Sequence, residues 1–278
     1  MIATLTSAAS KAFRKIGYTI IPTWRLAHFP LSEHLRRILQ TLEIDCVLDV
    51  GANTGQYRDF LRDQVGYEGT IVSFEPIPDL VEILRSRASQ DRRWFIEGCA
   101  LGAAAGQATF NVMVNTQFSS FLDPDHSMGE SLNGQNEVVQ TIAVEVKTID
   151  DVIPALKDRL GIRRPYLKLD TQGFDLEVIR GSREQLKTIP ALQTEISIKT
   201  IYHNMPSYVE AITALESLGF GISGIFPIHP ELQFPEAIEF DCIMAHRWNE
   251  HEPEPDLTTI SAADGLESAG LAHNRGWC

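Results

Sequence analysis

A short segment near residue 50 places an acid, two glycines and an asparagine close together. It reads DVGANTG from Asp49 to Gly55, after a β-prone run (46–50) and before a helix-like one (56–63). Small residues let the backbone turn sharply and approach a ligand closely, while the free N–H groups at the helix start face that ligand. Asn53 suits the turn because Asn tolerates left-handed backbone angles better than most residues. The segment therefore predicts a ligand-binding turn.

The glycine spacing and the nearby acids indicate which ligand. Gly51 and Gly55 flank Asn53, which is not the G-x-G-x-x-G spacing of dinucleotide-binding turns. Asp49 would be unfavourable beside a pyrophosphate but favourable beside a sulfonium or amino group. Glu75 lies 24 residues after Gly51, where an acid can accept hydrogen bonds from both hydroxyls of a ribose. These features predict S-adenosylmethionine as the cofactor rather than a nicotinamide dinucleotide.

Two carboxylates and a histidine follow later predicted strands. Asp170 ends the strand at 166–170 and Glu195 falls late in the strand at 192–198, so both should point into the crevice beyond the strand ends. His203 follows in a loop on the same edge, and histidine is a residue type that often serves as a general base. We expect Asp170 to be the base or the group that orients the acceptor, with Glu195 and His203 as further candidates. Each also has a structural or solvated alternative.

The remaining site predictions concern the adenine and metals. The residues after the third predicted strand, Ala100 and Leu101, would flank the adenine. The predicted cofactor-binding residues are Asp49, Gly51, Asn53, Gly55, Glu75, Pro76, Ala100 and Leu101. No metal is assigned: Asp170, Glu195, Asp241 and His203 would have to converge, and nothing in their spacing requires it.

Strand-like and helix-like segments alternate along most of the chain. Strands are predicted at 46–50, 70–74, 94–96, 166–170 and 192–198, and helices at 31–42, 56–63, 78–88, 176–180 and 208–218. This alternation is typical of an α/β fold with a parallel sheet and helices on both faces. Period-2 patterning at 109–114 and 138–146 predicts an inserted antiparallel pair, whose polar connecting loop is a plausible lid. The segments 221–228 and 238–245 read as a closing hairpin.

The domain organisation follows from these elements. We expect an N-terminal helical arm at 1–44, one α/β domain at 45–248 with its β insertion at about 103–148, and an acidic tail at 249–278. The tail has few large apolar side chains and is predicted to be disordered.

Charge and cysteine use limit the class of partner. The 278 residues carry 24 Lys+Arg and 37 Asp+Glu, a net charge of −13, which argues against nucleic acid and favours a neutral or cationic small molecule. The basic N-terminal arm leaves membrane contact open as an alternative.

Cys46, Cys99 and Cys242 lie in apolar runs without CxxC spacing, which is typical of inert buried thiols in a reducing compartment. No apolar run reaches the ~20 residues that span a bilayer, so we expect a cytoplasmic protein.

Several ordered motifs resemble the FkbM family of S-adenosylmethionine-dependent methyltransferases. They are VLDVGANTGQY, VSFEPIP, KTIDD, YLKLDTQGFDLEVIRGS, TEIS and YHNMPSYVEAITALESLGF, and the resemblance extends from about Leu35 to Arg247. It implies a class I methyltransferase (Rossmann-like) fold, with a mostly parallel seven-stranded sheet whose last strand is antiparallel. It also implies O-methylation of hydroxyls on sugars or polyketide-type natural products. Family members often have Glu where this chain has Gln172.

We therefore expect an O-methyltransferase that uses S-adenosylmethionine and acts on a hydroxyl of a small molecule, a sugar or a glycosylated natural product. Transfer would be in line, with a carboxylate or histidine accepting the proton. One alternative is a polyketide or other non-sugar acceptor. A nicotinamide oxidoreductase is disfavoured by the glycine spacing and by the lack of a suitably placed Tyr-x-x-x-Lys pair. A non-catalytic binding protein is kept open by Gln172. The identity of the acceptor, the hydroxyl that is methylated and the oligomeric state are not predicted.

Overall fold

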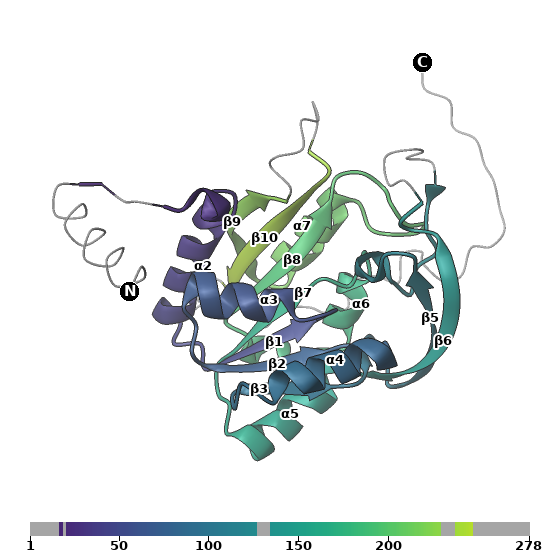
Figure 1. Ribbon diagram of the computed structural model, residues 1–278, viewed down its shortest axis with the longest axis horizontal. Helices are drawn as coiled ribbons and strands as arrows, with labels where there is room; N and C mark the ends of the chain where they lie inside the picture. Colours follow the sequence, from purple (N-terminus) through teal and green to yellow (C-terminus); the bar gives the residue numbers. More distant parts are fainter. Residues whose placement is uncertain (1–16, 19–20, 127–133, 229–236, 247–278) are drawn as a thin grey trace.

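The computed structural model describes residues 17–18, 21–126, 134–228 and 237–246 (Figure 1). The predicted tail at 249–278 and much of the N-terminal arm lie outside these residues. No helix in the described part combines the length and the apolar character that crossing a membrane requires.

Seven strands form the main sheet, in the order β3-β2-β1-β7-β8-β10-β9 (Figure 1). They are β1 (Cys46–Val50), β2 (Thr70–Phe74), β3 (Trp94–Glu97), β7 (Pro165–Leu169), β8 (Ala191–Ser197), β9 (Phe220–Pro227) and β10 (Glu239–His246). The pairings of β1 with β2 and β7, of β2 with β3 and of β7 with β8 are parallel, whereas β10 is antiparallel to both β8 and β9. The predicted mostly parallel sheet with an antiparallel last strand is confirmed.

The central strands β1 and β7 are buried along their whole length. Strands covered on both faces are rich in apolar residues at consecutive positions, which is why these segments could be recognised in the sequence. Each nevertheless carries one charged residue. Asp49 of β1 and Lys168 of β7 are partners in the strand register, so two buried charges lie side by side at the centre of the sheet.

Helices cover both faces of the sheet. On one face, the helices α2 (Phe29–Thr41) and α4 (Pro78–Ala88) pack beside α3 (Gln56–Asp59) and its π-helical continuation η2 (Phe60–Val65). On the other face lie α5 (Ile149–Leu160), α6 (Asp175–Arg180) and α7 (Tyr208–Ser217). Val47 packs with the first group and its neighbour Leu48 with the second, because successive strand residues point to opposite faces. Three short helices complete the described elements: η1 (Thr23–Arg25), η3 (Thr116–Phe118) and η5 (Leu186–Thr188).

Helix α5 is not predicted by the sequence analysis. It contains Pro154, which usually counts against a helix interior. Its start carries a local signal, because the Thr148 side chain accepts a hydrogen bond from the Asp151 N–H while the Asp151 carboxylate accepts one from the Thr148 N–H. This capping box begins the helix. Its buried apolar side chains, such as Ile153, hold it against the sheet.

The β insertion forms a second sheet in the order β4-β6-β5. Its strands are β4 (Ala100–Leu101), β5 (Gly106–Met113) and β6 (Val138–Lys147). The predicted antiparallel pair is present as β5 and β6, which form a curved unit beside the main sheet (Figure 1). The described part of the connecting loop, residues 115–126, is called the lid loop below.

Candidate functional site

The main cavity lies beyond the carboxyl ends of the parallel strands and has a volume of ≈ 710 Å³. Ligands of open α/β sheets bind at this edge, so the cavity is the candidate site. It is lined by the turn after β1, the ends of β2, β7 and β8, the start of β10, the α3–η2 segment and the lid loop. Carboxylates dominate its charged lining: Asp59, Asp63, Glu75, Asp170, Glu195, Glu239 and Asp241.

The turn after β1 is shaped by a close backbone contact. Gly51 has φ +81°, and a Cβ at this position would lie 1.9 Å from the carbonyl oxygen of Asp170. Only glycine therefore lets the end of β1 approach the end of β7 so closely. Asn53 also has a positive φ, of 48°, and lines the cavity. Gly55 has φ +90° but packs against the Trp94 ring outside the cavity lining, so the structure gives it a role in packing.

Glu75 is a buried acid on the cavity wall. Its carboxylate accepts hydrogen bonds from the backbone N–H of Asn53 at 2.8 Å and of Ile77 at 2.9 Å. Burial raises the pKa of Glu75 to about 7, although the two N–H groups favour the charged form. Pro76, Ala100 and Leu101 line the cavity beside it. These four residues line the same cavity, and their assignment to the adenosine end of a cofactor stays a prediction.

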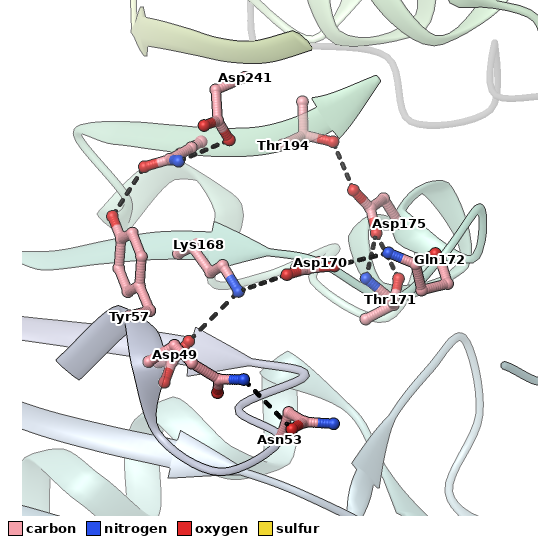
Figure 2. Close-up of polar contacts among 12 residues, drawn as sticks. Asp49, Asn53, Tyr57, Lys168, Asp170, Thr171, Gln172, Asp175, Thr194 and Asp241 are labelled. Atoms are coloured by element: carbon pink, nitrogen blue, oxygen red, sulfur yellow. Dashed lines mark hydrogen bonds and ion pairs between the residues drawn. The ribbon is translucent and has the colours of Figure 1, made fainter. Parts of the chain in front are cut away.

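Asp49 lies behind the cavity wall. It is fully buried, accepts a hydrogen bond from the Ser73 hydroxyl at 2.8 Å, and has Oδ1 3.5 Å from the Nζ of Lys168 (Figure 2). Burial raises its pKa, and the positive charge of Lys168 opposes that rise. Asp49 therefore acts on the site through Lys168 and does not line the cavity itself.

Lys168 is the only Lys or Arg among the described residues that line the cavity. Its Nζ lies 3.0 Å from Oδ2 of Asp170 and 5.1 Å from the centre of the Tyr57 ring (Figure 2). Burial disfavours the charged lysine, but the carboxylates of Asp170 and Asp49 outweigh it and hold the pKa of Lys168 above its ordinary value. The lysine stays positive beside two acids. From the sequence, Lys168 is expected to pair with a carboxylate, with a hydrogen bond to substrate as the alternative, and the structure shows the ion pairs.

Asp170 and Glu195 form a carboxyl–carboxylate pair. Asp170 is also hydrogen-bonded by the Gln172 side-chain amide at 2.9 Å. Burial would raise the pKa of Asp170, but Lys168 outweighs it and holds that pKa below the ordinary value. Burial and the Asp170 charge raise the pKa of Glu195 well above its ordinary value. Of the two carboxyl groups, Asp170 therefore favours the ionised form and Glu195 takes up a proton more readily.

A chain of neutral side chains ends on a further acid, Asp241. The hydroxyl of Tyr57 donates to Oε1 of Gln193 at 2.7 Å, and Nε2 of Gln193 donates to Oδ1 of Asp241 at 2.7 Å (Figure 2). Burial raises the pKa of Asp241 to about 6. Sequence reasoning missed Tyr57 and Gln193. The one available signal was that Gln193 and Glu195 alternate along β8 and so share a face.

The lid loop closes one side of the cavity. Thr116 accepts a hydrogen bond from the Asn53 side chain at 2.9 Å, and Ser120 donates to the carbonyl of Gln172 at 2.9 Å. The Tyr202 hydroxyl lies 2.7 Å from the carbonyl oxygen of Phe118 and 2.9 Å from Oε1 of Gln172. The loop is therefore connected to the turns that follow β1 and β7.

The structure does not bring His203 into the cavity. Its side chain is 60% exposed, and Nδ1 lies 3.7 Å from Oδ2 of Asp125 in the lid loop. The geometry gives a catalytic role for His203 no support, because the loop after β8 carries it to the outer surface. Among the described residues, no group of three or more His, Cys, Asp or Glu side chains has an arrangement that would hold a metal ion.

Comparisons with known proteins place the chain in a family. The sequence profile of the "Methyltransferase FkbM domain" matches residues 49–222, more than half of the chain. No curated protein matches the sequence. Among solved structures, an rRNA methylase from Streptococcus thermophilus is 12% identical with a TM-score of 0.42, over 82% of this chain and 99% of that one. Magnesium protoporphyrin IX methyltransferase from Synechocystis PCC 6803 is 10% identical with a TM-score of 0.43, over 83% and 87%. Scores this low add nothing to the assignment, which depends on the profile match: the chain belongs to the FkbM family of S-adenosylmethionine-dependent methyltransferases.

Proposed function

We propose that this protein is an O-methyltransferase whose acceptor is a hydroxyl of a neutral or cationic small molecule, a sugar or a glycosylated natural product. The observation that carries the proposal is the acidic lining of the cavity, in which seven carboxylates face one lysine among the described residues. Carboxylates hydrogen-bond well to hydroxyls and repel phosphates. Such a lining suits a polyhydroxylated acceptor and disfavours nucleic acid.

The residues present fit S-adenosylmethionine at the β1–β2 end of the cavity. The turn at 51–53 and the buried carboxylate of Glu75 line the same part of the cavity, and any Cβ at Gly51 would displace that turn by overlapping the Asp170 backbone. We assign the ribose hydroxyls to Glu75, the adenine to Pro76, Ala100 and Leu101, and the rest of the cofactor to the turn at 51–53. When bound, the cofactor supplies an electrophilic methyl group on a sulfonium, which is neutralised on transfer.

At the other end, Asp170 and Glu195 would orient the acceptor. Both carboxyl groups line the cavity and can accept hydrogen bonds from acceptor hydroxyls. The positive charge of Lys168 compensates the negative charge of Asp170 beside Glu195. Alignment of this kind provides much of the rate enhancement in a displacement reaction.

A product screen tests the function. The full-length protein is incubated with S-adenosylmethionine and a panel of methyl glycosides, amino sugars, nucleoside diphosphate sugars and polyketide lactones. We expect release of S-adenosylhomocysteine that depends on acceptor, with a product heavier by one CH₂ group on a sugar oxygen. Methylation of lactones alone would favour the non-sugar alternative. Binding of NADH or NADPH without binding of S-adenosylmethionine would contradict the proposal, as would methylation on nitrogen alone.

The cofactor end has its own test, with 5′-methylthioadenosine as a probe that has the ribose but no amino-acid moiety. We expect Glu75→Ala to weaken its binding by about 1–3 kcal/mol, because the ribose hydroxyls lose a charged acceptor. Those hydroxyls favour the ionised form of Glu75, whose pKa is about 7, so wild-type affinity should rise between pH 6 and pH 8. Titration calorimetry should show this rise in the wild type and in the exposed control Glu82→Ala, and none in Glu75→Ala. Equal affinities in all three proteins would remove Glu75 from the site.

A further inference from the structure

The start of β10 brings a further acid, Asp241, to the acceptor end of the cavity beside Asp170 and Glu195. Because β10 runs antiparallel to its neighbours, its first residues lie at the edge where the parallel strands end. Asp241 is the register partner of Glu195, and both line the cavity. The acid therefore faces the space proposed for the acceptor.

The carboxyl of Asp241 is held from one side only. Oδ1 accepts the hydrogen bond from Gln193, which is fixed in turn by the Tyr57 hydroxyl at 2.7 Å and approached by the Tyr166 hydroxyl at 3.4 Å (Figure 2). No described residue donates a hydrogen bond to Oδ2 of Asp241. One oxygen is thus oriented by the protein while the other is available to a ligand in the cavity.

We propose that Asp241 is the catalytic residue that accepts the proton of the acceptor hydroxyl, and that Gln193 and Tyr57 are positioning residues that orient its carboxylate. This inference rests on the proposed O-methyltransferase function and assigns a role that neither Asp170 nor Glu195 fills well. Asp170 is engaged by Lys168 and Gln172, which stabilise its ionised form, and Glu195 lies beside that charge, which together with burial raises its pKa and disfavours the ionised form that a base needs.

The electrostatic surroundings of Asp241 agree with this role. Its charged and titratable neighbours are Lys168 and Tyr166 of β7, Asp170 directly after β7, Glu195 of β8, Glu239 and Cys242 of β10 itself, and Tyr57 of α3. Its partner on β9, Phe226, does not titrate. Burial raises the pKa of Asp241 to about 6, with Gln193 and Lys168 lowering it and Asp170 and Glu239 raising it. A base whose pKa lies just below neutrality is ionised at pH 7 and still accepts a proton readily.

The proposed step balances in atoms and electrons. The hydroxyl proton passes to Oδ2 of Asp241, and a lone pair of the hydroxyl oxygen forms the new O–C bond. The C–S bond of the methyl donor breaks, and its electron pair stays on sulfur. Asp241 returns the proton to water after the product leaves, so the step needs no oxidant or reductant.

Carbon-13 NMR of labelled aspartate carboxyls tests the electrostatic part without any acceptor. The protein is titrated with S-adenosylhomocysteine bound, and the Asp241 signal is identified by its loss in Asp241→Asn. We expect an apparent pKa of about 6 in the wild type. Gln193→Leu should raise it, because a donor to the ionised form is lost, and the matched control Glu239→Gln should lower it, because a like charge is lost. A pKa near the ordinary Asp value of ~3.9 that neither substitution moves would overturn the proposal.

The pH profile of kcat/KM tests the catalytic part, with a glycoside methylated in the product screen as acceptor. We expect a loss of rate on the acid side near pH 6 in the wild type. Asp241→Asn should reduce kcat by about 10²–10⁴-fold and abolish this acid limb, with binding of S-adenosylhomocysteine unchanged. Tyr57→Phe should lower kcat less and shift the limb to higher pH, with the KM for S-adenosylmethionine unchanged.

Asp170→Asn distinguishes the two acids. We expect it to slow the reaction but to keep the acid limb, because Asp170 orients the acceptor and does not take the proton. An acid limb that survives in Asp241→Asn and disappears in Asp170→Asn would overturn the proposal. Purely nitrogen-methylated products would instead refute the proposed O-methylation, and the NMR titration would still report how Asp241 is held.

Discussion

At the scale of single residues, one glycine joins the two halves of the site. The cofactor turn after β1 and the acceptor acids after β7 come from segments more than a hundred residues apart, and they meet where Gly51 faces the backbone of Asp170. A side chain there would separate the two halves. Gly51 therefore affects both the stability of the sheet and the distance between the proposed donor and acceptor positions.

Gly51→Ala should reveal this dependence. The new Cβ would overlap a backbone oxygen at 1.9 Å and would require φ +81° of an alanine, so we expect stability to fall by more than about 3 kcal/mol. Gly66→Ala is a matched control, because Gly66 has φ +75° and no atom within 4 Å of an added Cβ. Gly66→Ala should lower stability only by the cost of a left-handed backbone conformation at alanine, about 1–2 kcal/mol. Urea unfolding measures both, and equal losses would contradict the role of the Gly51 contact.

Gln172 occupies the position where relatives often have Glu, and the structure gives this departure a physical consequence. Its amide donates to Asp170, which a carboxylate cannot do. Gln172→Glu would place a third acid beside Asp170 and Glu195. We therefore expect the pKa of the new carboxyl to be raised. A raised carboxyl pKa destabilises the folded state above the ordinary Glu pKa of ~4.3, so the loss should be small at pH 5 and reach roughly 1–2 kcal/mol at pH 8.

The uncharged variant Gln172→Leu is the control for that prediction. It removes the same hydrogen bond without adding a charge, so its loss of stability should depend far less on pH. Urea unfolding at pH 5 and pH 8 compares the two variants. If Gln172→Glu were as stable as the wild type at pH 8, Asp170 would not be the ionised member of the pair.

At the scale of elements, the local patterns were enough for most of the fold and for part of the site. The buried central strands, the antiparallel pair with period-2 patterning and the turn at Gly51 can be predicted from the sequence because each depends on consecutive residues. Helix α5 was missed because Pro154 opposes it while tertiary packing and the cap at Thr148 stabilise it. The hydrogen bond between Tyr57 and Gln193 joins residues 136 positions apart, so no pattern of neighbouring residues in the sequence predicts it. The exposure of His203 likewise depends on the path of a loop.

The lid loop is the element whose order should depend on a single hydroxyl. Tyr202 is fully buried, and its hydroxyl contacts both the lid loop at Phe118 and the cavity edge at Gln172. We expect Tyr202→Phe to speed hydrogen exchange several-fold in peptides spanning 115–126 while leaving the main sheet protected. Tyr208→Phe, at a tyrosine that is 43% exposed, is the control. Unchanged exchange in the lid loop would show that its other hydrogen bonds suffice to hold it.

At the scale of the whole molecule, the net charge of −13 has a spatial counterpart in the cavity. The sheet topology gathers acids from the ends of β2, β7 and β8 and the start of β10 at one edge, and burial raises the pKa of several of them. Glu195 and Glu75 have raised pKa values, whereas Asp170 stays ionised beside Lys168. The side chains around the proposed acceptor can therefore form hydrogen bonds and carry a net negative charge, so they do not favour an anion.

This arrangement predicts selection by acceptor charge. A hexose methylated in the product screen should be preferred over its phosphate ester by at least about tenfold in kcat/KM, because juxtaposed like charges cost several kcal/mol when partly desolvated. The preference should narrow as salt is raised, since screening weakens the repulsion. The S-adenosylhomocysteine released from each acceptor at low and high ionic strength measures both effects. A preference for the phosphate ester would show that the acceptor lies away from the acids of β7, β8 and β10, and the assignment of that end of the cavity would fall with it.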